Sequence, residues 1–323
     1  MTPALAVTLL LVFAIGIAIQ RGNTCTVVTF DDIVHRGSWD RLLSIVYTWF
    51  WVAGWLTVLA LTSGLKPAAH LVPVTVWSAV GGLLLGIGAV VNGACTTGTI
   101  ARIGSGEYTF GLTIVGFLLG CVAAPHLFGT PATTHVTTPA TATSLNHPVI
   151  TLIGFAVVTA VTLRRLIFGP HETFREFLHH AWDPRTAVLI ISVLFVAAVQ
   201  ISGAWSYTDM LGDISRGTHD HASAQFALLL AMLAGAILGG RSMRGPRLIG
   251  PLAPRVIRCT VGGAIMGVGF SLAAGAFDGF TLFGQPLLLP YAWAVMAACY
   301  VSVLVGVLYL RSGLGSRIKA LRG

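Results

Sequence analysis

Two of the five cysteines lie in short polar segments that interrupt long apolar runs. Cys25 belongs to Arg21-Gly22-Asn23-Thr24-Cys25-Thr26, and Cys95 belongs to Asn92-Gly93-Ala94-Cys95-Thr96-Thr97-Gly98-Thr99. Small residues and glycines permit a break in a helix. The N-terminus of a short helix that follows such a break attracts anions through its free N–H groups. The two segments therefore predict a site for a small anion, with a thiol in each half of it.

The other side chains of these segments suit the same chemistry. Arg21 supplies positive charge near one cysteine, and threonine hydroxyls supply hydrogen-bond donors near the other. The candidate site in the two segments comprises Arg21, Cys25, Asn92, Gly93, Cys95, Thr96, Thr97 and Gly98. For Cys121, Cys259 and Cys299, which lie in or at the end of apolar runs, we expect buried and inert packing.

The composition defines the elements that must position these segments. Of 323 residues, 55% are hydrophobic and only 9% are charged, whereas a soluble chain has about 25% charged residues. So few charges cannot cover the surface of a water-soluble globule. The composition excludes a soluble enzyme, a disordered chain and a secreted disulfide scaffold, and it predicts a polytopic all-α membrane protein.

Apolar runs of about 20 residues, the length that crosses a bilayer as a helix, occur nine times. The predicted spans cover about residues 3–20, 42–64, 71–91, 108–128, 148–168, 186–204, 223–240, 259–276 and 288–310. The remainder is mostly loops, so we expect residues 1–323 to form a single integral membrane domain. The first run has no basic residue before it and no cleavage site after it, which favours a true span over a signal peptide.

The basic residues predict the orientation of the spans. With nine crossings, every lysine and arginine except Lys66 and Arg216 falls on the side that also holds the C-terminus. Since basic loops stay in the cytoplasm, we expect an inner (plasma) membrane protein with its N-terminus outside and its C-terminus inside. The net charge of +8 is explained by contact with anionic lipid headgroups, and it needs no nucleic acid.

Two connections on the opposite side are polar. Residues 129–147 are rich in Thr, Ala and Pro, and residues 206–221 carry three aspartates. We interpret both as flexible, solvated connections. His219-Asp220-His221 lies in the second, and a solvated loop is a better interpretation of it than a metal site.

Two glycine-rich segments repeat each other at one constant spacing along the chain. Gly81, Gly82, Gly86, Gly88 and Gly98 correspond to Gly262, Gly263, Gly267, Gly269 and Gly279. Such glycines could serve close helix packing alone. The two copies, however, lie in spans of opposite direction, which is the signature of an inverted repeat in transporters. We therefore predict pseudo-repeat halves at about 1–128 and 148–310, with residues 129–147 as the linker.

Taken together, these motifs resemble the YeeE/YedE family of sulfur-compound membrane proteins, whose best-known members take up thiosulfate. The resemblance rests on Arg-Gly-x-x-Cys after the first helix, on Gly-Gly-x-x-x-Gly-x-Gly leading into Gly-Ala-Cys-x-x-Gly-Thr, and on the second glycine copy. It covers about residues 5–310. It implies an hourglass-like bundle with short broken helices from both sides. It also implies a path in which Cys25 and Cys95 relay thiosulfate without a covalent intermediate.

One segment departs from the family pattern. The second copy usually ends in Gly-Cys-x-x-Gly, but this chain has Gly275-Ala276-Phe277-Asp278-Gly279. Gly275 and Asp278 therefore join the candidate site. Asp278 is either solvated at an outer helix end or functional, as a proton acceptor or as a contact for a different substrate. The departure broadens the expected substrate from thiosulfate to a small sulfur-containing anion.

Two functions from different classes follow. The leading one is uptake of thiosulfate or a related anion through a cysteine-lined path, by a protein that is not an enzyme and has no cofactor or metal. The alternative is a membrane sulfur-handling protein that forms a cysteine persulfide and passes the sulfur to a small cytoplasmic carrier protein. The alternative needs an activated thiol, and no histidine adjoins either cysteine in the sequence. The chain has no Walker loop, so we expect no ATP hydrolysis.

Overall fold

The computed structural model describes residues 3–63, 72–129, 148–168, 179–218, 222–244 and 253–312. Every regular element in these ranges is helical, as the composition predicts. The same ranges contain nine helices, some of them broken, that are long and apolar enough to cross a membrane. Of the predicted connection at 129–147, residues 130–147 lie outside the described residues, and so does His219-Asp220-His221.

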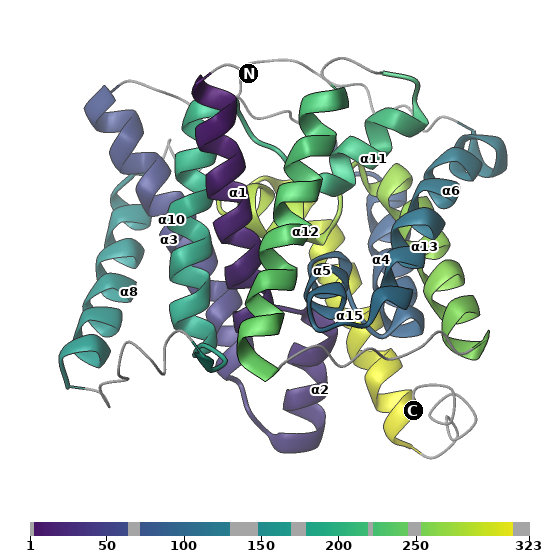
Figure 1. Cartoon of the computed structure of the whole chain (residues 1–323), viewed down its shortest axis with the longest axis horizontal. Helices are drawn as coiled ribbons and strands as arrows, with labels where there is room; N and C mark the ends of the chain where they lie inside the picture. Colours follow the sequence, from purple (N-terminus) through teal and green to yellow (C-terminus); the bar gives the residue numbers. More distant parts are fainter. Residues whose placement is uncertain are drawn as a thin grey trace.

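The elements follow one another in the order expected for spans joined by short connections. They are α1 (Pro3–Gly22), α2 (Thr26–Arg36), α3 (Asp40–Ser63), α4 (Val76–Asn92), α5 (Thr96–Gly104), η1 (Tyr108–Phe110), α6 (Gly111–Phe128), α8 (Pro148–Phe168), α10 (Pro184–Ser202), α11 (Tyr207–Ser215), α12 (Ala222–Arg244), α13 (Ala253–Ala273), α14 (Phe277–Gly279), η2 (Phe280–Gly284) and α15 (Pro290–Arg311). Helix α1 begins at the top of Figure 1 and α15 ends toward the bottom, as an odd number of crossings between them requires.

Two of the spans are broken near their middle. The chain leaves α1 at Asn23, whose φ of 45° ends the helix, and starts α2 three residues later. Arg41 of α3 donates from Nη1 to the carbonyls of Gly22 and Asn23 at 3.2 and 2.8 Å. These bonds satisfy carbonyls that a helix end leaves without an intrahelical partner. The break between α4 and α5 is similar, with Gly93 at a φ of 84°.

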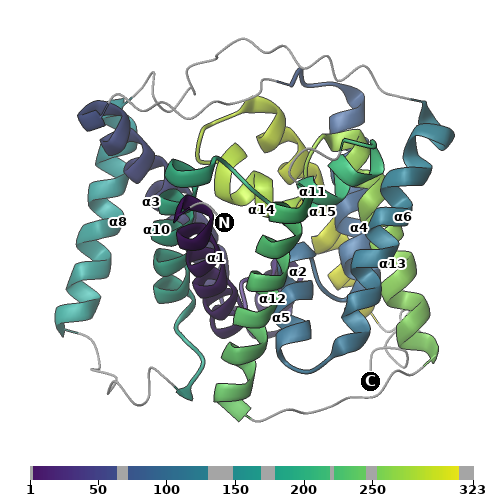
Figure 2. The ribbon, with the colours of Figure 1, turned by 45° about the horizontal axis from the view of Figure 1, so that its top comes forward.

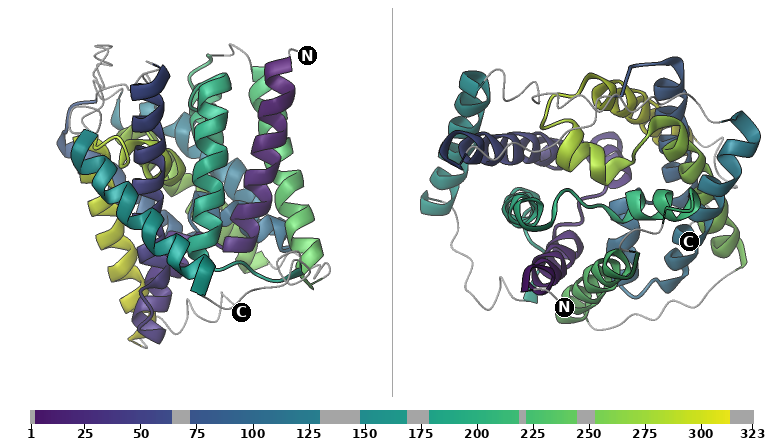
Figure 3. Two further views of the ribbon diagram at one scale, coloured as in Figure 1. Left: turned by 90° about the vertical axis from the view of Figure 1, so that its left-hand side faces the viewer. Right: turned by 90° about the horizontal axis from the view of Figure 1, so that it is seen from above.

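Two further short helices, α11 and α14, lie toward the opposite end of the molecule from α2. Figure 1 has α2 and α5 toward the bottom and α11 toward the top, and Figure 2 has α14 near α11. Helix α11 follows α10, and α14 follows α13 and continues into the π-helical turn η2. Short helices therefore enter the bundle from both sides. In the view from above in Figure 3, the yellow-green turns of α14 lie near the middle of the molecule, between longer helices.

The glycine segments bring helices α4 and α13 into backbone contact. A Cβ on Gly81 would lie 2.8 Å from the Gly269 carbonyl oxygen, and one on Gly269 would lie 2.8 Å from the Gly81 oxygen. Any larger residue would force the two helices apart, because such short contacts do not occur in folded proteins. The glycines therefore serve the close packing of the two segments on each other.

The interpretation of residues 206–221 as a flexible, solvated connection is wrong for its first part. Residues 207–215 form helix α11, and Tyr207, Thr208, Met210 and Leu211 are buried. Ser206 caps this helix by accepting a hydrogen bond from the Asp209 amide at 3.1 Å. The three aspartates of the segment suggest solvent. The spacing of its apolar residues, one helical turn apart, is the signal for a buried helix.

Candidate functional site

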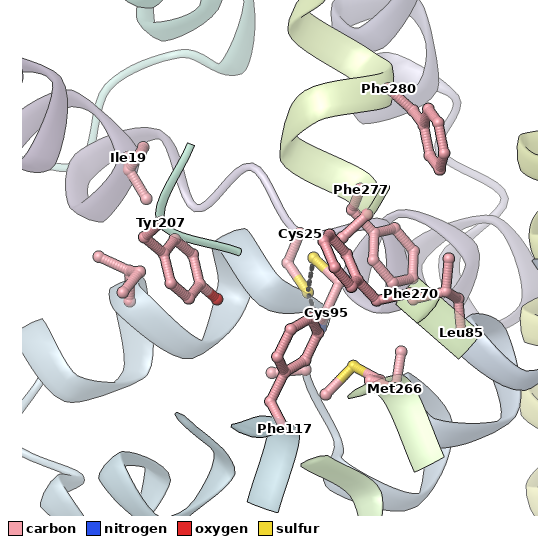
Figure 4. Close-up of a cluster of buried hydrophobic side chains, with 14 of the residues drawn as sticks. Ile19, Cys25, Leu85, Cys95, Phe117, Tyr207, Met266, Phe270, Phe277 and Phe280 are labelled. Atoms are coloured by element: carbon pink, nitrogen blue, oxygen red, sulfur yellow. Dashed lines mark hydrogen bonds between the residues drawn. The ribbon is translucent and has the colours of Figure 1, made fainter. Parts of the chain in front are cut away.

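The two thiols predicted to share a site are in contact. Cys25 is the residue before α2, Cys95 is the residue before α5, and their sulfur atoms lie 3.5 Å apart. Both side chains are buried and neither forms a disulfide. We call Cys25 and Cys95 the thiol pair. Figure 4 shows the pair beside the side chains of Phe117 and Phe270.

Backbone N–H groups at the start of α5 point at both sulfur atoms. The Cys95 amide donates to Cys25 Sγ at 3.4 Å, and the Gly98 amide donates to Cys95 Sγ at 3.4 Å. Amides at a helix N-terminus carry partial positive charge and favour electron-rich partners. The first turn of α5 therefore supplies an electropositive surface around the thiol pair without any charged side chain.

Gly98 leaves the space that the Cys25 side chain occupies. A Cβ built on Gly98 would overlap Cys25 Sγ and would lie 2.9 Å from Cys25 Cβ. The sequence predicts Gly98 as part of a helix break, of the glycine repeat and of the candidate site. The structure adds another reason for a glycine at this position, because no side chain fits between α5 and Cys25.

Asn92 and Gly93 hold the break between α4 and α5. The side-chain nitrogen Nδ2 of Asn92 donates to the Ala94 carbonyl at 2.8 Å and to Thr99 Oγ1 at 3.2 Å. Its Oδ1 accepts from Thr113 Oγ1 at 2.8 Å. Asn92 is fully buried. A buried polar group with this many partners fixes local geometry, because every alternative leaves some of them without a hydrogen bond. Asn92 thus positions Cys95 and does not contact it in any of these bonds.

Asp278 lies where three short helices meet. Its Oδ1 accepts hydrogen bonds from Thr96 Oγ1 of α5 at 3.2 Å and from Thr208 Oγ1 of α11 at 2.9 Å. Tyr207 of α11 donates to the Thr96 carbonyl at 2.9 Å. These contacts exclude the interpretation of Asp278 as a solvated residue at an outer helix end. They connect the second glycine segment directly to the first turn of α5, next to the thiol pair.

A cavity of about 800 Å³ reaches this cluster. Thr26, Thr97, Tyr207, Gly275 and Asp278 all line it. Thr26, the residue directly after Cys25, is part of the cavity wall. Cys25 and Cys95 do not line the cavity, and they are 2% and 1% exposed. The structure therefore has a large cavity that stops one residue short of the thiol pair.

Arg21 does not share the position of the other candidate residues. Its Nη2 donates to Ser242 Oγ of α12 at 2.7 Å, and its guanidinium lies over the Trp182 ring, 5.2 Å from the centroid. These contacts direct its charge toward α12 and the segment before α10. The sequence, in which Arg21 lies four residues before Cys25, predicts positive charge beside that thiol.

Sequence reasoning missed Tyr207, Thr208 and Asp209, which line or close the cavity from α11. A signal for them existed, since Ser206 stands as far after Cys25 as the second glycine segment stands after the first. The remaining cysteines are buried as expected: Cys121, Cys259 and Cys299 are at most 1% exposed.

Comparisons with known proteins point the same way as the site. The chain is similar to the thiosulfate transporter TsuA of Escherichia coli (strain K12), with 23% identity over 241 residues, covering 66% of this chain and 68% of that protein. The profile of the family described as sulphur transport matches residues 21–305, which run from the segment before the first thiol to the last span. With nine apolar spans among the residues that the structure describes and most of its length matched, this membrane protein belongs to the sulphur transport family.

Proposed function

We propose that the protein takes up thiosulfate, or a closely related small sulfur anion, along a central path that passes between Cys25 and Cys95. The observation that carries this proposal is the contact of two free, buried thiols, 3.5 Å apart, next to the end of a large cavity. Similarity to a thiosulfate transporter favours thiosulfate among the possible anions.

The chemistry of the thiol pair suits passage better than tight binding. Thiols form weak hydrogen bonds in both directions, and the terminal sulfur of thiosulfate is soft and polarizable. A conducting path must hold an ion strongly enough to admit it and weakly enough to release it. Because no covalent bond to the substrate is needed, we infer that the protein is not an enzyme.

Desolvation of a dianion inside a membrane must be offset by the protein. Removing a charge from water costs far more than one hydrogen bond returns. The N-terminal amides of α5 around the thiol pair and the threonine hydroxyls of the cavity wall supply several partial positive charges. Electropositive helix ends inside broken helices are a recurrent solution to this problem in transporters.

We further infer that the fold is an inverted repeat with the outline of an hourglass. The element boundaries support this inference, because the shift that relates the two glycine segments also relates the two sets of short helices. Helix α2 starts at Thr26 and α11 at Tyr207, and α5 starts at Thr96 and α14 at Phe277. The residues before them then pair as Cys25 with Ser206 and Cys95 with Ala276.

The glycine contacts support the same symmetry. A Cβ on Gly82 would overlap the Val295 carbonyl oxygen of α15, and a Cβ on Gly263 would overlap the Thr113 oxygen of α6. Helix α4 thus packs between α13 and α15, and α13 packs between α4 and α6. By this reasoning the second half begins at α10 and not at residue 148. Helix α8, which packs on α3 beside Trp51 and Trp55, is then an added span between the halves.

The charge distribution supports an inner (plasma) membrane protein with its N-terminus outside and its C-terminus in the cytoplasm. Arg36 and Arg41 flank the end of α2 and the start of α3, and Arg311 ends α15, at the same side of the bundle. Basic residues at one side are retained in the cytoplasm. In that orientation α2 and α5 lie in the cytoplasmic half.

Transport by single-cysteine variants tests the proposal. Cys25→Ala and Cys95→Ala should each abolish uptake of ³⁵S-labelled thiosulfate in cells that lack other thiosulfate uptake, while the protein inserts at normal levels. Cys299→Ala is the matched control, because Cys299 is equally buried but lies in α15, and it should transport normally. Full uptake by both Cys25→Ala and Cys95→Ala would refute a path through the thiol pair.

A further inference from the structure

Resting on the proposed function, we propose that the protein carries a proton together with the sulfur anion, and that Asp278 with Asp209 holds this proton. Both carboxylates line the cavity, and the proposed contact of the anion with the thiol pair gives them no task. The inference assigns them the task of coupling transport to the proton gradient.

The position of Asp278 puts it on the route of the substrate. It lines the cavity and bonds to Thr96, which directly follows Cys95. An anion that moves from the cavity toward Cys95 therefore comes close to the carboxylate. Figure 4 shows Phe277, the residue before Asp278, beside the thiol pair. A group on the route can change its protonation with each passage.

Asp209 lies close enough to act on the charge of Asp278. It follows Thr208, the hydrogen-bond donor to Asp278 Oδ1, and its own Oδ2 lies 3.7 Å from the position that a Cβ on Gly279 would take. Two carboxylates in one partly desolvated space cannot both be ionised at low cost. The geometry therefore favours one proton shared by the pair.

In the described part of the chain, the charged groups around the two carboxylates leave them without a free cation. The titratable groups that face the pair are Tyr207 and Asp213 of α11, Arg216 directly after α11, and Tyr291 of α15. Arg216 is the cation of this set, and its Nη2 lies 2.8 Å from Asp213 Oδ1. The charge of Arg216 is thus already balanced by Asp213.

A dianion approaches this site only at high electrostatic cost unless Asp278 is protonated. With Asp278 ionised, its negative charge at the cavity wall would repel the dianion. With Asp278 protonated, its hydroxyl becomes a hydrogen-bond donor toward an anion oxygen. Proton and anion therefore favour each other's binding, which is the thermodynamic condition for symport.

The repeat relationship puts the counterparts of the two thiols close to the same carboxylates in sequence. Ser206 corresponds to Cys25 and Ala276 to Cys95 at the spacing of the glycine segments. The half of the path built from α11 and α14 thus has no thiol at either position, and Asp209 and Asp278 follow these positions by three and two residues. An oxygen-rich half can handle a proton, whereas the thiol half contacts the soft sulfur.

Simultaneous measurement of anion and proton movement tests the inference. The purified protein is reconstituted into liposomes that contain a pH-sensitive dye, and ³⁵S-thiosulfate is added outside. We expect the wild-type protein to acidify the lumen in fixed proportion to thiosulfate uptake. Uptake should rise as the external pH falls, by up to about tenfold per pH unit for one proton.

Asp278→Asn should remove the proton flux and flatten the pH dependence of any remaining uptake, because the amide cannot take up and release the proton, although its oxygen can still accept the two threonine hydrogen bonds. Asp31→Asn is the matched control, since Asp31 has a 50% exposed side chain on α2, and it should retain the wild-type coupling. Asp209→Asn leaves the threonine bonds in place and removes a repelling charge, so the pH of half-maximal uptake should fall. If Asp278→Asn transports no thiosulfate at all, the shift in the pH of half-maximal uptake by Asp209→Asn is the deciding measurement.

Wild-type uptake without acidification would overturn the inference, and so would wild-type coupling in Asp278→Asn or an unshifted pH midpoint in Asp209→Asn. None of these results affects the path through the thiol pair. That proposal fails only on full uptake by the variants Cys25→Ala and Cys95→Ala, so the two failures are distinguishable.

Discussion

Replacing Gly98 by alanine should separate the two thiols and impair transport while the protein still folds. The added methyl group would overlap Cys25 Sγ and would lie 2.9 Å from Cys25 Cβ and 3.3 Å from Ala94 Cβ. The neighbours on α5 and α4 are fixed by Asn92. Cys25 is therefore the group that has to move.

The magnitude follows from two opposing effects. Overpacking in a filled interior costs about 1–3 kcal/mol. Alanine also stabilises a helical position relative to glycine by up to about 1 kcal/mol. A net penalty near the middle of these values, about 1.4 kcal/mol, corresponds to about tenfold in the population of the arrangement with paired thiols. We therefore expect uptake to fall by about tenfold and the melting temperature in detergent to fall only slightly.

The assay compares uptake and melting temperature in three variants. Gly111→Ala is the control, because a Cβ there meets nothing within 4 Å, and it should change neither quantity. The double variant Gly98→Ala with Cys25→Ala removes the overlapping sulfur, so it should recover the melting temperature without recovering transport. Wild-type uptake and stability in Gly98→Ala alone would refute the conclusion that this contact positions the thiol pair.

Three further predictions follow from the site. Asn92→Ala leaves Thr113 without its buried acceptor and removes two more hydrogen bonds, so we expect a loss of about 2–4 kcal/mol, visible as a clearly lower melting temperature; an unchanged value would contradict a positioning role. Tyr207→Phe removes the bond to the Thr96 carbonyl and should lower uptake a few-fold, as loss of about 1 kcal/mol implies, with insertion unaffected. Mass spectrometry after incubation with thiosulfate should find no stoichiometric persulfide on either thiol, whereas such an adduct would favour the sulfur-handling alternative.

The sequence was sufficient for features that each span decides by itself. A transmembrane helix must be apolar over its own length, so nine runs in the sequence became nine candidate spans among the residues that the structure describes. Helix breaks were also predictable, because Gly93 supports the positive φ that ends α4 locally. Helix α11 escaped prediction because its aspartates suggest a loop, and its burial is decided by helices distant in the chain.

Only the tertiary structure decided which polar groups meet. The sequence placed Cys25 and Cys95 in similar segments far apart in the chain, but their contact at 3.5 Å depends on how two broken spans pack. It placed Arg21 close to Cys25, yet packing directs the guanidinium to Trp182 and Ser242. Asp278 could face solvent or the interior from its sequence alone. Its hydrogen bonds to Thr96 and Thr208 exist because ends of three short helices converge, and that convergence is a property of the whole bundle.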